Sequence, residues 1–148
     1  MGLSALQGKR GPDGDASARV WGGDLTLKHR PLRRAIYHSF ELEGEILRSE
    51  VDGFGAHADE RLTGGYLHAR WQARRRWWLE GRFDRVERAS AGSSPEEERW
   101  TGLVAFAPSE FSALRLEYAT LEPFSGDRDH QLLLQLNFSI GPHPAHTY

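Results

Sequence analysis

The sequence predicts an all-β protein, an antiparallel up-and-down meander of seven or eight long strands that forms a transmembrane β-barrel segment. Three observations lead to this prediction. Apolar and polar residues alternate in nearly every segment, which places them on opposite faces of a strand. The final predicted strand, Gln131–Gly141, is longer than the usual soluble strand of about 5–6 residues. Long loops and short turns also alternate along the chain, as they do in membrane barrels.

Each predicted strand is a run of alternating residues bounded by turn residues. In chain order the strands are Met1–Gly8 (the tail of a strand), Ala18–His29, Ala35–Ser49, Thr63–Ala73, Arg76–Arg88, Glu98–Ala107, Phe111–Leu121 and Gln131–Gly141. Long polar loops are predicted at Gly8–Asp15, Glu50–Leu62, Ala89–Pro95 and Pro123–Asp129, and short turns at Arg30–Arg33, Arg74–Arg75 and Pro108–Glu110. In Glu98–Ala107 the pattern does not show which residues share a face. Arg33–Arg48 is the nearest candidate for a helix, but its period is not helical.

The last predicted strand shows the two faces most clearly. Leu134, Leu136 and Phe138 share one face, and Gln135 and Asn137 share the other. A tilted membrane-spanning strand needs about 9–11 residues and presents an apolar residue to lipid at every second position. Five aromatic residues fall near strand ends on or close to the apolar face, as in interfacial belts: Trp21, Trp71, Trp77, Trp100 and Tyr118. Alternation alone does not separate a lipid-facing surface from a dry core, so a soluble barrel stays open.

The opposite face carries charges of both signs, and a water-filled lumen would accommodate them. The predicted pore-lining residues are Glu41, Glu43, Glu45, His68, Arg70, Arg82, Arg115 and Glu117. The three glutamates repel one another along one strand, so arginines are expected opposite them, with Arg70 as the candidate. In a wet lumen this row attracts cations; it serves equally as one side of a set of salt bridges.

Composition excludes several classes of function. The net charge of −2 argues against nucleic-acid binding, which requires a concentrated basic surface. The chain has no cysteine, so it has neither disulfides nor a thiolate metal site. The first residues do not form a signal peptide. Because an exported protein needs a targeting signal, we expect residues 1–148 to be the C-terminal part of one outer-membrane β-barrel domain.

The residues from Leu134 to Tyr148, LQLNFSIGPHPAHTY, carry a resemblance. They resemble the end of a family of Gram-negative outer-membrane proteins described as zinc-regulated, TonB-dependent-receptor-like or porin-like β-barrels. The resemblance implies a larger barrel in the bacterial outer membrane, with a role in zinc uptake. It also implies outer-membrane lipid, the barrel-assembly machinery and an energy-coupling periplasmic protein as partners. A coupling box and a plug domain would lie before this segment, so energy coupling does not follow from these residues.

The C-terminal residues carry two further predictions. Prolines at 142 and 144 cannot donate to a ladder, so residues 142–148 are expected to be a short periplasmic tail. Phe138 and Tyr148 are the candidate assembly signal. His143 and His146 are the candidate metal ligands, because imidazole suits zinc, although a structural zinc site needs about four ligands.

The function that we expect is passage or uptake of a small solute, possibly zinc, through an outer-membrane barrel. No nucleophile elbow, phosphate-binding glycine loop or metalloprotease motif is present, so we expect no enzymatic activity. No cofactor is predicted apart from zinc as a transported or bound ion. Two alternatives stay open: a small eight-stranded structural membrane barrel, and a soluble lipocalin-like ligand-binding barrel.

Overall fold

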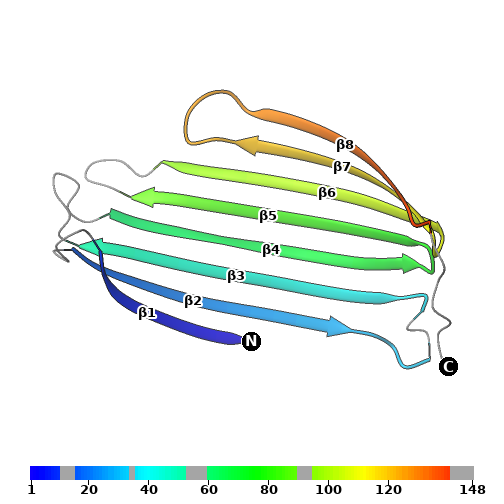
Figure 1. Cartoon of the computed structure of the whole chain (residues 1–148), viewed down its shortest axis with the longest axis horizontal. Coiled ribbons are helices and arrows are strands. Elements are labelled where there is room, and N and C mark those ends of the chain that lie inside the picture. Colours follow the sequence, from blue (N-terminus) through cyan, green and yellow to red (C-terminus); the bar gives the residue numbers. More distant parts are fainter. Residues whose placement is uncertain (11–15, 34–35, 53–59, 90–94, 141–148) are drawn as a thin grey trace.

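The computed structural model describes residues 1–10, 16–33, 36–52, 60–89 and 95–140. These residues form one eight-stranded sheet (Figure 1). Its strands are β1 (Gly2–Arg10), β2 (Ala16–His29), β3 (Ser39–Asp52), β4 (Glu60–Arg74), β5 (Trp77–Ala89), β6 (Glu96–Ser109), β7 (Ser112–Glu122) and β8 (Asp129–Phe138).

The strands follow chain order across the sheet, and every neighbouring pair is antiparallel. The predicted all-β antiparallel up-and-down meander is therefore confirmed. The described part of Arg33–Arg48 contains no helix, since β3 occupies most of it. In the portion of the chain that the structure describes, no helix is long and apolar enough to cross a membrane.

The strands are bounded differently from the prediction at several points. β3 begins at Ser39 and not at Ala35, because the buried amide of Gln72 donates hydrogen bonds to the carbonyl groups of Ile36 (3.1 Å) and Arg75 (3.4 Å). The Gln72 side chain thereby holds the chain before β3 in a turn. β8 ends at Phe138 and not at Gly141, because its partner strand β7 begins at Ser112, directly opposite Phe138; one further hydrogen bond, from the Ser139 N–H to the Phe111 carbonyl, extends the pairing.

The connections correct the predicted contrast in loop length. The connections 75–76 and 110–111 are tight, but residues 30–38 make a longer connection than any at the opposite end of the sheet. The strands also run farther into the predicted long loops, so that only residues 53–59 separate β3 from β4. We call the end of the sheet with the connections β2–β3, β4–β5 and β6–β7 the turn end, and the opposite end the loop end (Figure 1).

Register assigns the residues of every strand to one of two faces. Trp100 pairs with Phe83, and Thr101 pairs with Arg82, which settles the facing of β6 that the sequence left open. Trp100, Gly102, Val104 and Phe106 belong to the apolar face. The five aromatic residues predicted near the apolar face all lie on it: Trp21, Trp71, Trp77, Trp100 and Tyr118.

The sheet has almost no dry interior. Among the described residues, the buried ones are Ala105 (8% exposed), Ala119 (2%) and Gln72 (8%), and all three lie on the polar face. Large apolar side chains on the other face stay exposed, Leu134 at 66%. β1 and β8 form the two edges of the sheet and make no contact with each other in the described structure (Figure 1).

Candidate functional site: a charged face and an apolar band

The polar face collects the charged residues that the sequence singled out. Cross-strand register places all eight predicted pore-lining residues on this one face: Glu41, Glu43, Glu45, His68, Arg70, Arg82, Arg115 and Glu117. They come from β3, β4, β5 and β7. Antiparallel pairing brings them together because residues directly opposite each other on neighbouring strands point to the same side of the sheet.

A row of alternating charges crosses four strands of this face. Register aligns Lys28, Glu41, Arg70 and Glu80, from β2 to β5. Lys28 forms an ion pair with Glu41, and Arg70 Nε lies 3.2 Å from Glu80 Oε1. Arg70 is opposite Glu41 as expected, but its ion pair is with the glutamate on its other side. Each residue of this row therefore has an oppositely charged neighbour.

A second cluster lies next to this row. His68 Nε2 is 3.4 Å from Glu80 Oε2, and His68 Nδ1 is 3.9 Å from Glu43 Oε2. Arg82 donates to both carboxylate oxygens of Asp84 at 2.7–2.9 Å and stacks over the Tyr66 ring at 4.1 Å. These contacts hold the long side chains of His68 and Arg82 close to the polar face of the sheet.

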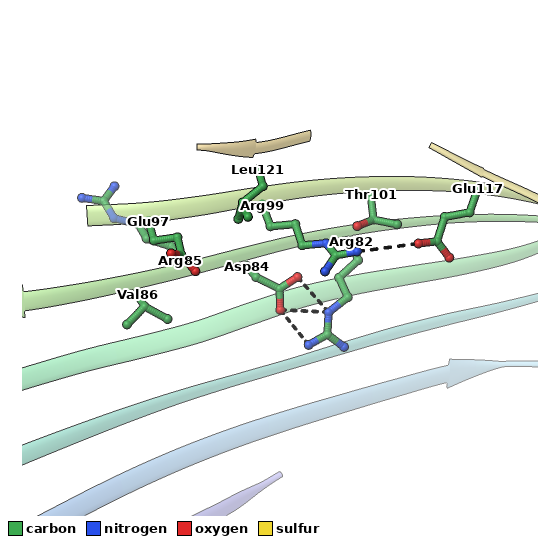
Figure 2. A pocket seen from close by; sticks show the side chains of 9 residues that line it. All are labelled: Arg82, Asp84, Arg85, Val86, Glu97, Arg99, Thr101, Glu117 and Leu121. Carbon is green, nitrogen blue, oxygen red and sulfur yellow. Dashed lines mark hydrogen bonds and ion pairs between the residues drawn. The ribbon is translucent and has the colours of Figure 1, made fainter. Parts of the chain in front are cut away.

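A hollow of about 520 Å³ opens on this face over β5, β6 and β7 (Figure 2). Arg82, Arg99 and Glu117 surround it, and Arg99 Nη2 lies 3.9 Å from Glu117 Oε1. Thr101 also lines the hollow and pairs with Ala119, so two small side chains leave room between the charged ones. The hollow is open, and charged groups of both signs line it beside the apolar side chains of Val86 and Leu121, so it can admit a hydrated small solute.

Sequence reasoning missed three members of this face as site residues: Lys28, Glu80 and Arg99. Alternation places Lys28 and Glu80 on the polar face of their strands, but the register between strands determines which charged residues lie opposite them. Arg99 was hidden because the small residues of β6, such as Gly102 and Ala105, blur its alternation. Of the described residues, none forms an ion pair with Arg115 within 4.0 Å.

The apolar face carries a band whose position shifts steadily across the sheet. On β2 the band runs from Trp21 to Leu27, and on β8 from Leu132 to Phe138. Successive cross-strand pairs connect Leu27 to Leu132. Leu27 is the last residue of the band on β2, at the turn-end border, whereas Leu132 is its first residue on β8, at the loop-end border. The band is therefore displaced by six residues over the six steps from β2 to β8, about one residue per strand.

Aromatic side chains lie at both borders of this apolar band, with Trp21, Trp100 and Tyr118 on the loop-end side, but the loop end also carries ion pairs. Aromatic side chains mark the border at the turn end: Phe40, Trp71, Trp77, Phe106 and Phe138. The Trp77 and Phe106 rings pack at a centroid distance of 4.6 Å. Charged pairs mark the border at the loop end, including Arg48 with Glu50 (2.7 Å) and Arg85 with Glu96 (2.6 Å).

One more charged pair lies beyond the loop-end border. Arg128 donates to the Glu122 carboxylate at 2.6 Å. This hydrogen bond raises the pKa of the Arg128 guanidinium, which lies in the exposed connection between β7 and β8.

The predicted metal ligands and part of the assembly signal fall outside the described residues. These are His143, His146 and Tyr148, together with the predicted tail 142–148. Phe138 is described: it is the last residue of β8, on the apolar face and 72% exposed. Within the described ranges, no three His, Cys, Asp or Glu side chains are grouped so that they could hold a metal ion.

The fold and the two faces define the chain as a two-faced antiparallel meander with a charged side and an apolar side. No family model, curated protein or solved structure matches this chain.

Proposed function

We propose that this chain forms part of the wall of a β-barrel in the bacterial outer membrane, and that the barrel passes a small polar solute without enzymatic activity. One observation carries the proposal: large apolar side chains stay exposed along one face, while the few buried residues and the charged hollow belong to the other face. A soluble protein buries its apolar face, whereas lipid removes the cost of exposing it.

The displacement of the apolar band supports the membrane setting independently. Strands rise about 3.3 Å per residue and lie about 4.8 Å apart, so a shift of one residue per strand corresponds to a tilt of about 35°. Membrane barrels tilt their strands by about 35–45°, and the band stays level with the membrane because it crosses the tilted strands obliquely. A solvent-exposed sheet has no reason to keep such a band.

The lipocalin-like alternative is disfavoured by the same arrangement. A lipocalin encloses its ligand in an apolar interior. Here the charged row and the hollow occupy the face that would be the interior, and the leucine-rich face points away from it.

We further propose that the complete barrel has more than eight strands, with this chain as its C-terminal part. The two edge strands, β1 and β8, lie at opposite sides of the sheet (Figure 1). A sheet edge of unpaired backbone groups is unstable within hydrocarbon, so further strands are needed to cover both. An eight-stranded structural barrel remains the alternative, and it would require β1 to pair with β8.

Zinc is the solute that the C-terminal resemblance favours, and His143 and His146 stay its predicted ligands. The proposed partners are outer-membrane lipid, the barrel-assembly machinery acting on Phe138 and Tyr148, and an energy-coupling periplasmic protein. The described residues supply charged groups of both signs, which suit a hydrated ion or a small polar molecule.

Refolding of the chain with and without lipid tests the membrane setting. We expect circular dichroism to show β-structure, and flotation to show membrane association, when the chain is diluted from urea into phosphatidylcholine vesicles, where the edge strands β1 and β8 must pair between copies of the chain. Aggregation is expected in buffer alone. A chain that stays monodisperse and folded without lipid or detergent would overturn the proposal.

Cysteine cross-linking tests the strand number, because the chain has no cysteine of its own. Leu3→Cys on β1 is combined in turn with Leu132→Cys, Leu134→Cys or Leu136→Cys on β8. A larger barrel predicts no intramolecular disulfide in any combination. Efficient cross-linking in one of them would instead establish the closed eight-stranded barrel.

A further inference from the structure

We infer that the loop-end border of the apolar band holds a binding site for a phosphate-bearing lipid headgroup, formed by Arg48, Arg61 and Arg85. The inference rests on the proposed membrane setting and adds a specific lipid partner to it. All three arginines are on the apolar face, with side chains 51%, 60% and 47% exposed.

By register, the three arginine residues flank one stretch of β4. Arg48 is directly opposite Thr63 on one side, and Arg85 is directly opposite Gly65 on the other. Arg61 lies two residues along β4 from Thr63, and therefore on the same face. The small residues Thr63 and Gly65 thus form a floor with arginines on three sides.

Gly65 is needed for the sheet itself, and this keeps the floor low. A Cβ atom at position 65 would lie 2.7 Å from the Glu45 carbonyl oxygen, a backbone atom that cannot move aside easily. The position therefore cannot carry a side chain that would fill the space between Arg48 and Arg85.

The site adjoins the apolar band without a gap. Ile46 is directly opposite Gly65 and is 59% exposed, so an acyl chain on Ile46 would bring its headgroup to the height of Thr63. Arginine binds phosphate with paired, charge-assisted hydrogen bonds, and the Thr63 hydroxyl can add another. This continuity with the band favours a lipid phosphate over a free phosphate ion.

Carboxylates flank the arginines and define the setting of the site. Glu50 binds Arg48 at 2.7 Å and lies 3.9 Å from Arg61, and Glu87 is directly opposite Thr63. Glu96 binds Arg85. A border with both signs suits a headgroup layer in which divalent cations join phosphates to one another and to carboxylates. The five aromatic residues that define the turn-end border carry neither a guanidinium group nor a carboxylate.

Lipid retention measured by native mass spectrometry tests the site. The protein is extracted in neutral detergent from phosphatidylcholine vesicles with and without phosphatidylglycerol and magnesium. The wild type is expected to retain phosphatidylglycerol, and Arg48→Gln/Arg85→Gln to bind it about tenfold more weakly. Arg99→Gln/Arg115→Gln, which removes two arginines from the polar face, is the matched control and should bind as the wild type does.

A second variant keeps all charges and blocks the floor. Thr63→Trp should weaken phosphatidylglycerol retention as well, because the indole occupies the space of the phosphate. Equal phosphatidylglycerol retention by Arg48→Gln/Arg85→Gln and by its control would overturn the site. Equally strong binding of inorganic phosphate alone would also overturn it. If the wild type does not enter phosphatidylcholine vesicles, the proposed membrane function fails instead, and the headgroup site fails with it.

Discussion

The two faces of this sheet differ in how their side chains find partners. On the polar face, long charged residues bond to one another across strands, as Arg70 does with Glu80 at 3.2 Å. On the apolar face, leucines such as Leu132 and Leu136 lie 72% and 60% exposed and have little to pack against. Most charged side chains of the polar face therefore have a partner on the same face, whereas the large side chains of the apolar face stay exposed in the described structure.

Two neighbouring residues of β6 allow the strongest test of this difference. Val104 lies on the apolar face and Leu103 on the polar face, where it pairs with Glu80 and Glu117. Val104→Arg is expected to destabilise folding into phosphatidylcholine vesicles by about 2–4 kcal/mol, the cost of an arginine facing the bilayer midplane. Leu103→Arg gains two carboxylate neighbours and should change the stability by less than about 1 kcal/mol.

The measurement is urea titration of vesicle-bound protein, followed by tryptophan fluorescence. Equal costs for the two arginine substitutions would mean that the two faces have the same environment, and the comparison would then fail.

Two glycines of the apolar face give an intermediate effect. Gly65→Ala should destabilise the protein by about 1–3 kcal/mol, because the new methyl group meets the Glu45 carbonyl oxygen at 2.7 Å. Gly102→Ala is the control: nothing lies within 4 Å of its Cβ, so it should be neutral or stabilise by about 0.5–1 kcal/mol. The same urea titration measures both variants. If Gly65→Ala is as stable as Gly102→Ala, β3 and β4 are not as close at this point as the structure has them.

The smallest expected effect concerns a single ion pair of the polar face. Lys28→Gln removes the partner of Glu41 and should destabilise the protein by less than about 1 kcal/mol, since both side chains remain partly solvated. Arg115→Gln removes a charge that has no ion-pair partner among the described residues and should cost less still. A double-mutant cycle of Lys28→Gln with Glu41→Gln isolates the pair. A coupling of zero would show that the row of charges is a solvated surface without mutual support.

Much of the fold could be predicted from local sequence. Alternation in segments such as Leu132–Phe138 identifies a strand and its two faces, because the side-chain period of a strand is two. The short turns predicted at Arg74–Arg75 and Pro108–Glu110 lie within a residue or two of the connections at 75–76 and 110–111. The failures were at ends that distant contacts decide: Gln72 sets the start of β3, and the turn before β7 sets the end of β8.

The candidate site divides in the same way. The sequence by itself determined that Glu41, Arg70 and Arg82 share a face, since each position follows from alternation within its own strand. It did not determine that Arg70 binds Glu80, or that Arg48 and Arg85 lie on either side of Thr63 and Gly65. Those neighbours belong to different strands.

Only the tertiary structure decided the register, the shift of the apolar band and the two unpaired edges at β1 and β8. The physical reason is that register is a relation between strands far apart in the chain. Moving one strand by two residues keeps every side chain on its face, yet it changes every cross-strand partner and the tilt of the band. Alternation within a strand is the same in all these registers, so it could not choose among them.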